Sequence, residues 1–161
     1  MRQTLSNSDH ETFSLQKELE YLSLYVAFEQ ERFSNHIRFV TTIGVNAEET
    51  EILPMMIQPF IENALKHAGL HETEQPQITL EVEAVRNLLK IMIRDNGKGI
   101  TIQRDELEQK SHAISIIRSR IRLLFENEQQ PLPETLLVLR SVPEISAGTE
   151  VVFYIPLLSK F

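Results

Sequence analysis

The stretch from Pro54 to Ala68 has the pattern of a helix with two faces. Pro54 suits the first turn of such a helix, because the backbone N–H that proline lacks has no partner there anyway. Apolar residues recur at spacings of three and four and form one stripe: Met56, Phe60, Ile61, Ala64, Leu65 and Ala68. The polar face carries Glu62, Asn63, Lys66 and His67. These groups could bind a phosphate and a metal ion, or they could be a solvated surface.

A second stretch, Ile91 to Ile100, places an apolar strand directly before Asp-Asn-Gly-Lys-Gly. Asn-Gly is common in tight hairpins, so a turn between two strands is one interpretation. A hairpin needs a matching strand soon after Gly99, and residues 101–111 are polar and charged without clear alternation. The glycines therefore indicate a loop that a ligand can approach closely.

Together the two stretches resemble the nucleotide-binding domain of the GHKL superfamily. Residues Gln58–His67 fit the asparagine box of LytS/YehU-type sensor histidine kinases, Gln-Pro-hydrophobic-hydrophobic-Glu-Asn-Ala-x-Lys-His, at every position. Residues 95–99 (Asp-x-Gly-x-Gly) resemble the first glycine box, and residues 148–149 (Gly-Thr) resemble the last. The resemblance covers nearly the whole chain, and three boxes in this order are much more specific than one glycine motif.

The composition limits the possible partners. The 161 residues suit one domain plus a short appendage. A net charge of −7 and a pI near 5.3 argue against nucleic acid, because no basic stripe is available to contact its phosphates. The chain has no cysteine, so disulfides and cysteine-ligated zinc are excluded.

The hydropathy pattern bears on localisation. No apolar run is long enough to span a bilayer, and Met1 to Ser6 lack the apolar core of a signal peptide. We therefore expect a soluble, cytoplasmic polypeptide without direct membrane contact. The resemblance further implies a parent protein anchored in the bacterial inner membrane by an N-terminal region outside this chain.

The N-terminal part of the chain predicts a long helix. Ser14 is a candidate N-cap for a helix from Leu15 to Phe33. Its apolar face is unusually wide: Leu15, Leu19, Tyr21, Leu22, Leu24, Tyr25, Val26, Phe28 and Phe33. Such width indicates packing on two sides, or a helical partner outside this chain. The resemblance assigns residues 1–35 to a linker helix and the end of a dimerisation and phosphoacceptor region, and residues 36–161 to the ATP-binding domain.

The rest of the sequence alternates strands and helices. Strands are expected at residues 37–43, 78–82, 89–95, 135–139 and 149–155, and a further helix at 114–125. The first strand should have one well-buried face, and Arg86-Asn87 should turn the second strand back into the third. Five strands with helices on one face predict an α+β fold, a two-layer sandwich. The order matches the Bergerat fold that the resemblance implies, with a mixed, mostly antiparallel sheet.

The resemblance also implies roles for two polar residues. Asn63 would ligate Mg²⁺ through its amide oxygen, because a hard cation that keeps several waters favours oxygen ligands beside the substrate phosphates. The alternative for Asn63 is an amide that caps or bridges local backbone. Asp95 would accept an exocyclic N–H of the adenine of ATP, and its alternative is an Asx residue that stabilises the turn.

Other residues would complete this site. Four are expected around the adenine and ribose: Gly97, Gly99, Gly148 and Thr149. Lys66 and His67 lie on the side expected to meet the phosphates. Glu62 joins Asn63 as a candidate catalytic residue, although it does not match the position of the water-activating glutamate of gyrase-like relatives. It could orient the incoming phosphoacceptor.

The sequence departs from the family in the lid. Relatives commonly show Gly-x-Gly-Leu-x-Asn there, whereas this chain has Ser111 and Ala113 at the glycines and Ile116 at the asparagine. The glycines let N–H groups at the helix start point at the phosphates, and a methyl group at Ala113 costs roughly 1 kcal/mol or more if φ must be positive. We therefore expect Ser111 and Ala113 to grip the phosphates more weakly. Three arginines follow, either near the phosphates or on the solvated side of a helix: Arg118, Arg120 and Arg122.

The phosphoacceptor histidine of the family is not found in this sequence. Relatives carry it in a Pro-His-Phe-Leu-Phe-Asn motif, and none of the five histidines has those neighbours. The resemblance thus implies the catalytic fragment of a two-component sensor histidine kinase, which binds ATP and Mg²⁺ but does not autophosphorylate alone. The parent would form a homodimer, transfer the γ-phosphoryl group to a histidine in its own upstream domain, and pass it to a response regulator.

Two alternatives from other classes stay open. One is a non-catalytic pseudokinase or docking module with a degenerate lid, which a lack of nucleotide binding would favour. The other is a GHKL serine kinase of the anti-sigma type, which an upstream histidine motif in the full gene would exclude.

Overall fold

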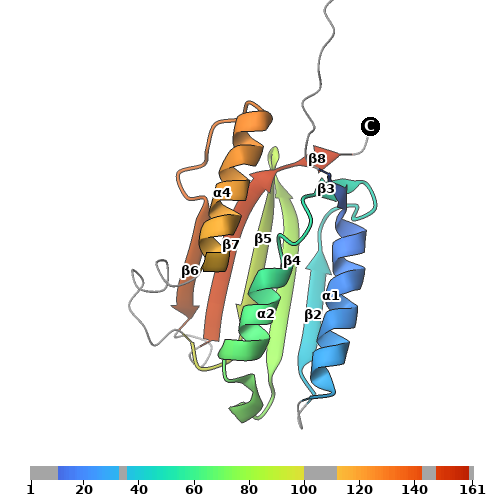
Figure 1. Ribbon diagram of the computed structural model, residues 1–161, viewed down its shortest axis with the longest axis vertical. Coiled ribbons are helices and arrows are strands. Elements are labelled where there is room, and N and C mark those ends of the chain that lie inside the picture. Colours follow the sequence, from blue (N-terminus) through green and yellow to red (C-terminus); the bar gives the residue numbers. More distant parts are fainter. Residues whose placement is uncertain (1–10, 33–35, 100–111, 143–147, 160–161) are drawn as a thin grey trace, which may run out of the picture.

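A five-stranded sheet forms one layer of the protein (Figure 1). The computed structural model describes residues 11–32, 36–99, 112–142 and 148–159. In spatial order the strands are β2 (Arg38–Ile43), β4 (Gln77–Val85), β5 (Leu88–Asp95), β7 (Gly148–Pro156) and β6 (Leu137–Val142). β2 and β4 are parallel, and the other neighbours are antiparallel. The sheet is therefore mixed and mostly antiparallel, as predicted.

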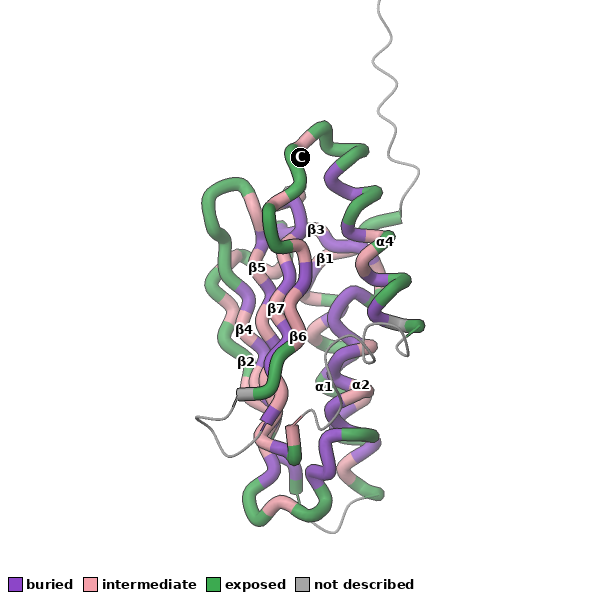
Figure 2. The backbone as a smooth tube through the Cα atoms, turned by 90° about the vertical axis from the view of Figure 1, so that its left-hand side faces the viewer, coloured by how far each residue is buried: buried purple, intermediate pink, exposed green. Residues whose placement is uncertain are grey.

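In the described part of the chain, the sheet is covered on one face by α1 (Leu15–Gln30), α2 (Gln58–His67) and α4 (His112–Asn127). The side view in Figure 2 shows two layers, with buried residues where they meet. The strand residues that form this core alternate along the chain: Ile78, Leu80, Val82, Leu89, Ile91, Ile93, Val151, Phe153 and Ile155. Such alternation is expected of a sheet covered on one side. The predicted α+β two-layer sandwich is confirmed.

A second, small sheet lies beside the start of α1, and no sequence pattern predicts it (Figure 1). Its strands are β1 (Phe13–Ser14), β3 (Thr50–Ile52) and β8 (Leu158–Ser159). β3 pairs with both of the others in antiparallel fashion. Strands of two or three residues are too short to show a period of two, so periodicity cannot reveal them. A short 3₁₀ helix, η1 (Leu70–Glu72), follows α2.

The helix predicted from Pro54 begins at Gln58 instead. Residues 54–57 form a turn in which Met55 has a φ of 58°. Pro59, and not Pro54, is the proline in the first turn of α2. The predicted start is wrong because a contact with α1, described below, fixes this boundary in place of local propensity.

The predicted strand at residues 37–43 is present as β2, but its burial was overestimated. Ile37 is buried, whereas the residues of β2 itself are half-buried or exposed. β2 is the edge strand of the sheet, so its apolar residues have one neighbouring strand rather than two. The hairpin turn at Arg86-Asn87 is confirmed: Arg86 has a φ of 58°, and Val85 pairs with Leu88.

α1 begins at Leu15, as predicted, although the Ser14 side chain makes no capping hydrogen bond. The helix divides its wide apolar face into two parts. Three residues are buried: Leu15, Leu22 and Val26. Three others are largely exposed: Tyr21 (53%), Leu24 (72%) and Phe28 (65%). None of the described helices is long and apolar enough to cross a membrane.

Candidate nucleotide site

The helix α2 carries the polar residues that the sequence singles out. Asn63 is half-buried, and its side chain makes no hydrogen bond within the described residues. The alternative in which this amide caps or bridges local backbone is therefore not observed. Lys66 and His67 are exposed in the last turn. Both basic groups are accessible to a ligand, and Asn63 is partly so.

Glu62 is held by neighbours on its own helix. The Gln58 Nε2 atom donates to Glu62 Oε1 at 2.7 Å, and the Lys66 Nζ atom lies 3.5 Å from Glu62 Oε2. Tyr25 of α1 lies close by: burial raises the pKa of its hydroxyl, and the charge of Glu62 adds to this increase. The Glu62 carboxylate is thus oriented by a neutral amide, Gln58, and by a cation, Lys66.

Asp95 is the last residue of β5, the central strand of the five-stranded sheet. Its Oδ1 atom accepts hydrogen bonds from the backbone N–H of Gly97 at 3.0 Å and of Thr149 at 3.3 Å. The first bond is an Asx turn, so the structural alternative for Asp95 is realised. Oδ2 accepts neither of these backbone bonds, and the side chain of Thr149 also hydrogen-bonds the carboxylate. Burial raises the pKa of Asp95, and the hydrogen bonds partly offset this effect.

The glycine loop after Asp95 is fastened to the end of α2. A Cβ atom on Gly97 would lie 2.1 Å from the carbonyl oxygen of Ala68, so no larger residue fits there. The N–H of Lys98 donates to the same oxygen at 2.7 Å. Gly99 has a φ of 72°, a conformation that favours glycine. The helix of Asn63 and the loop of Asp95 are therefore joined directly.

Gly148 brings the start of β7 onto the end of β5. A Cβ atom at this position would lie 1.9 Å from the carbonyl oxygen of Asp95. This close approach lets the next residue, Thr149, reach the Asp95 side chain. The close packing of β7 against β5 thus explains why glycine precedes Thr149, in addition to the role that the resemblance implies for this pair.

Glu150 is a buried charge that the sequence pattern does not reveal. It is 1% exposed, accepts a hydrogen bond from Arg94, and accepts another from Arg140 Nε at 2.7 Å. Burial opposes its ionisation, but the hydrogen bonds and the positive charges of the two arginines together outweigh burial and lower the pKa of Glu150. The three residues face one another because the strand register aligns them, and that register cannot be read from the sequence.

Asn96 anchors the glycine loop to the neighbouring strand. Its side chain accepts a hydrogen bond from the N–H of Gln77 at 2.7 Å and donates one to the carbonyl oxygen of Gln75 at 2.7 Å. The sequence indicates Asn96 only as part of an Asn-Gly motif. Its observed role is to hold the loop in place beside β4.

The predicted lid is seen in part. Ser111 lies outside the described residues, while Ala113 and Ile116 lie in α4. Ala113 has helical backbone, so the strain of a positive φ does not arise there. Arg120 is not on the solvated side: it donates to the carbonyl oxygen of Pro54 at 2.7 Å. Arg122 is exposed.

Among the described residues, no three His, Asp or Glu side chains gather into a metal-binding cluster. A magnesium ion held here would therefore need oxygen ligands from a bound phosphate and from water. Mg²⁺ is commonly held in this way in nucleotide-binding proteins.

Residues 48–159 match the family described as histidine kinase-, DNA gyrase B- and HSP90-like ATPases. The matched region is more than half of the chain and contains Asn63, Asp95 and Thr149. The chain belongs to this ATPase family. The resemblance seen in the three sequence boxes is thereby confirmed.

Two curated relatives of this ATPase domain are sensor proteins. The sensor protein LytS of Staphylococcus epidermidis is 32% identical over 99 residues, which are 62% of this chain and 17% of LytS. The sensor protein kinase HptS of Staphylococcus aureus is 34% identical over 111 residues, which are 69% of this chain and 21% of HptS. The chain thus spans about a fifth of the length of these relatives.

Solved structures share the fold of this ATPase domain. The ATP-binding domain of PrrB from Mycobacterium tuberculosis has a TM-score of 0.60 at 18% identity, covering 94% of this chain and 100% of that one. The blue-light activated histidine kinase EL346 of Erythrobacter litoralis has a TM-score of 0.60 at 17% identity, covering 90% and 46%. At such identities the similarity concerns the fold alone.

Glu18 of α1, which precedes the matched region, contacts helix α2 of the candidate site and is not among the residues that the sequence motifs indicate. It is 2% exposed and contacts the start of α2. A signal was present: Glu18 follows Leu15 by three residues and precedes Leu22 by four, so it lies within the buried apolar stripe. An acidic residue at such a position needs a buried partner.

Proposed function

We propose that this ATPase domain is the catalytic domain of a two-component sensor histidine kinase. The parent protein would transfer the γ-phosphoryl group of ATP to a histidine in an upstream domain outside this chain. The relation that supports the proposal is the attachment of the Asp95 loop to the Asn63 helix through Lys98 and Ala68, because it joins the segments of the proposed adenine acceptor and the proposed metal ligand. The names of the two sensor relatives support the same assignment.

The roles of the residues follow from their chemistry. Asp95 would accept an adenine N–H, with Thr149 beside it, and Gly97, Gly99 and Gly148 would allow close approach of base and ribose. Asn63 would ligate Mg²⁺, which when bound neutralises charge on the phosphates. The phosphates would meet a further set of groups: Lys66, His67, Ser111 and Ala113. Glu62 would orient the phosphoacceptor.

In the proposed phosphoryl transfer, no residue of this chain would form a covalent bond to the substrate. An imidazole nitrogen of the acceptor histidine would attack the γ-phosphorus, the bond to the β-phosphate oxygen would break, and ADP would leave. Residues of the present chain would act by holding the nucleotide in line with the acceptor.

The proposal extends to partners and location. Residues 1–35 would link the phosphoacceptor region to the ATP-binding domain of residues 36–161. The parent would be a homodimer on the cytoplasmic side of the bacterial inner membrane, and a response regulator would receive the phosphate. We propose no nucleic-acid partner, in keeping with the net charge of −7.

A pseudokinase is the second candidate, because Ser111 and Ala113 replace two lid glycines. The two candidates differ in nucleotide binding. We would titrate the purified chain by calorimetry with ADP and with a non-hydrolysable ATP analogue, with and without Mg²⁺. The variants are Asp95→Ala and Asn63→Ala. The matched control is Asn87→Ala, at an exposed asparagine in the β4–β5 turn.

The kinase proposal predicts binding that Asp95→Ala abolishes. It also predicts that Asn63→Ala removes the Mg²⁺ dependence of that binding, and that Asn87→Ala changes neither. Folded wild-type protein that binds no nucleotide would favour the pseudokinase. Equal effects of Asn63→Ala and Asn87→Ala would remove Asn63 from the metal site.

A further inference from the structure

A buried carboxylate of α1 caps the first turn of α2. Glu18 is 2% exposed, and its oxygens accept hydrogen bonds from the backbone N–H groups of Met55 (3.2 Å), Ile57 (3.2 Å) and Gln58 (3.4 Å). The first N–H groups of a helix have no partner within that helix, and the helix dipole favours an anion there. A residue of one helix thus supplies the cap for another, about forty positions along the chain.

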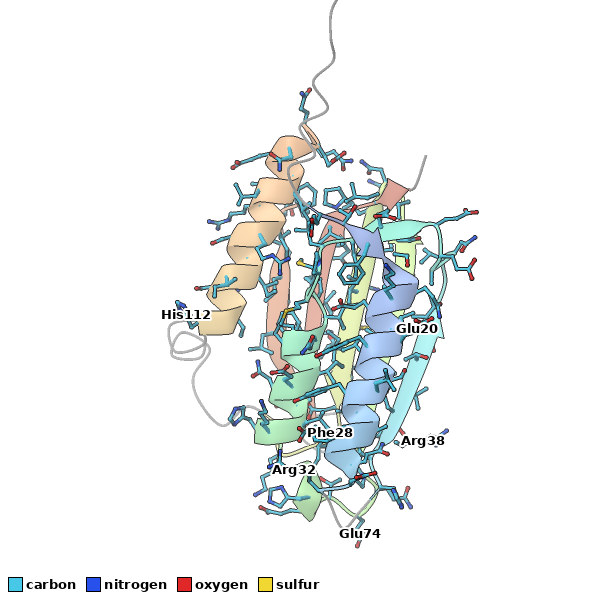
Figure 3. All side chains as sticks on the ribbon, turned by 45° about the vertical axis from the view of Figure 1, so that its right-hand side comes forward. Glu20, Phe28, Arg32, Arg38, Glu74 and His112 are labelled. Carbon is cyan, nitrogen blue, oxygen red and sulfur yellow. The ribbon has the colours of Figure 1, made fainter. Side chains whose placement is uncertain are left out.

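The same turn is held from the other side by α4. The Arg120 Nη2 atom donates to the carbonyl oxygen of Pro54 at 2.7 Å. Burial lowers the pKa of the Arg120 guanidinium, and the nearby charge of Glu18 acts against this effect. Figures 1 and 3 show α2 between α1 and α4, with His112 at the start of α4. Three helices therefore meet at one polar cluster, in which Glu18 is buried and Arg120 half-buried: Glu18, residues 54–58 and Arg120.

This cluster has a mechanical consequence for the candidate site. Met55 has a φ of 58°, which is unfavourable for a residue other than glycine, and the bond from its N–H to Glu18 helps to hold this conformation. Asn63 lies five residues after Gln58 in the same helix, about 8 Å along the axis. A shift of the first turn of α2 would therefore move the Asn63 side chain with it.

We propose that Glu18 is a positioning residue for the nucleotide site: it fixes α2, and hence Asn63, relative to α1, and Arg120 joins α4 to the same point. A change in the position of α1 then acts first on Asn63, and it reaches the adenine side only through the far end of α2, where Lys98 is bonded to Ala68. The inference rests on the proposed function and adds a coupling between the helices that surround the site.

The test compares two buried carboxylates of α1. Glu18→Gln keeps the size of the side chain but removes the charge, and its amide donors oppose the N–H groups of α2. The matched control is Glu29→Gln: Glu29 is 8% exposed, and its ion partner is Arg32 of the next turn, 3.4 Å away. Both are titrated with ADP without Mg²⁺ and with a non-hydrolysable ATP analogue with Mg²⁺, below their unfolding temperatures.

Glu18→Gln should reduce the gain in affinity that Mg²⁺ brings by about three- to thirtyfold, and should reduce the affinity for metal-free ADP by much less. Glu29→Gln should change neither. Equal losses with and without Mg²⁺, or no loss, would overturn the inference, because a general loss of packing does not distinguish the two sides of the site. If Glu18→Gln does not fold, Arg120→Gln tests the same cluster, with exposed Arg122→Gln as its control.

Hydrogen exchange separates this inference from the proposed function. If wild-type protein binds no nucleotide, the proposed function fails, and exchange at the amides of Ile57 and Gln58 decides whether Glu18 holds α2. Faster exchange there in Glu18→Gln than in Glu29→Gln supports the positioning role, and equal exchange overturns it.

Discussion

The backbone N–H of Thr149 donates a hydrogen bond to Asp95 Oδ1 at 3.3 Å, although 54 positions separate the two residues. The same oxygen accepts the N–H of Gly97 at 3.0 Å. One carboxylate is thus held by two different segments before any ligand arrives. Such preorganisation reduces the conformational entropy that the side chain loses when a ligand binds. Because Oδ1 is held in place, the orientation of Oδ2 is fixed as well.

Asp95→Asn should weaken nucleotide binding without unfolding the protein. The asparagine Oδ1 can still accept both backbone hydrogen bonds, but an amide donor replaces the second oxygen and would face the adenine amino group. We expect a loss of affinity for ADP of at least about tenfold by calorimetry. Glu83→Gln, at an exposed residue of β4, is the control. Unchanged affinity in Asp95→Asn would remove Asp95 from the adenine site.

The raised pKa of Asp95 predicts how stability depends on pH. Because burial raises this pKa above its ordinary value of 3.8, the folded protein holds the proton more tightly than the unfolded chain. The contribution of Asp95 to stability therefore falls as pH rises from below 3.8 to above the raised pKa. Urea unfolding over this range should show the wild type losing stability relative to Asp95→Asn. A change in the opposite direction would contradict the assignment of burial as the main cause.

Gly148→Ala should destabilise the protein by about 1–3 kcal/mol, because the new Cβ atom would lie 1.9 Å from the Asp95 carbonyl oxygen and force β5 and β7 apart. Gly44→Ala is the control. Its Cβ atom would have the Val82 carbonyl oxygen as nearest neighbour at 3.3 Å, which a small movement relieves, so we expect a loss below about 1 kcal/mol. Urea unfolding measures both, and equal losses would show that the contact at Gly148 is not tight.

The elements that the sequence predicts well are those with enough length to show a period. β4 and β5 alternate apolar and polar residues over eight or nine positions, and the turn at Arg86-Asn87 joins them as expected. The asparagine helix and the glycine loop were found from local motifs. Their attachment through Ala68 could not be predicted in this way, because it joins two segments that are distant in the sequence.

The features that the sequence does not predict all depend on tertiary contacts. The start of α2 moves from Pro54 to Gln58 because Glu18 of α1 binds the intervening turn. Glu150 is buried because the strand register places Arg94 and Arg140 on either side of it. No local sequence pattern predicts either contact. The position of the acidic Glu18 within an apolar stripe does, however, indicate that this residue needs a buried partner.

Restoring glycine at Ser111 and Ala113 should raise affinity for the ATP analogue more than affinity for ADP. Glycine would let N–H groups turn toward the γ-phosphate, which ADP lacks. Glycine at Ala113, in the first turn of α4, also costs about 1 kcal/mol of helix stability, which thermal unfolding would report separately. The control is Ser115→Gly, at an exposed residue of the same helix. A double variant with no gain in ATP affinity or turnover would show that these positions do not limit phosphate binding.

Glu150→Gln should destabilise the protein near neutral pH and have little effect in acid. The lowered pKa means that ionised Glu150 stabilises the fold above its ordinary pKa of 4.5, and that this stability is lost as pH falls through the lowered value. Glutamine removes the charge and leaves Arg94 and Arg140 facing each other. Their side chains are 37% and 63% exposed, so water screens the repulsion and we expect about 1–3 kcal/mol at pH 7.

The pH dependence distinguishes this charge effect from a packing effect. Urea unfolding at pH 7 should separate Glu150→Gln from the wild type, and the two curves should converge once the wild-type carboxylate is protonated. Glu83→Gln is the control, because its partner Lys90 forms an ion pair at an exposed carboxylate. A difference for Glu150→Gln that persists unchanged in acid would mean that shape, and not charge, holds the start of β7 beside Asp95.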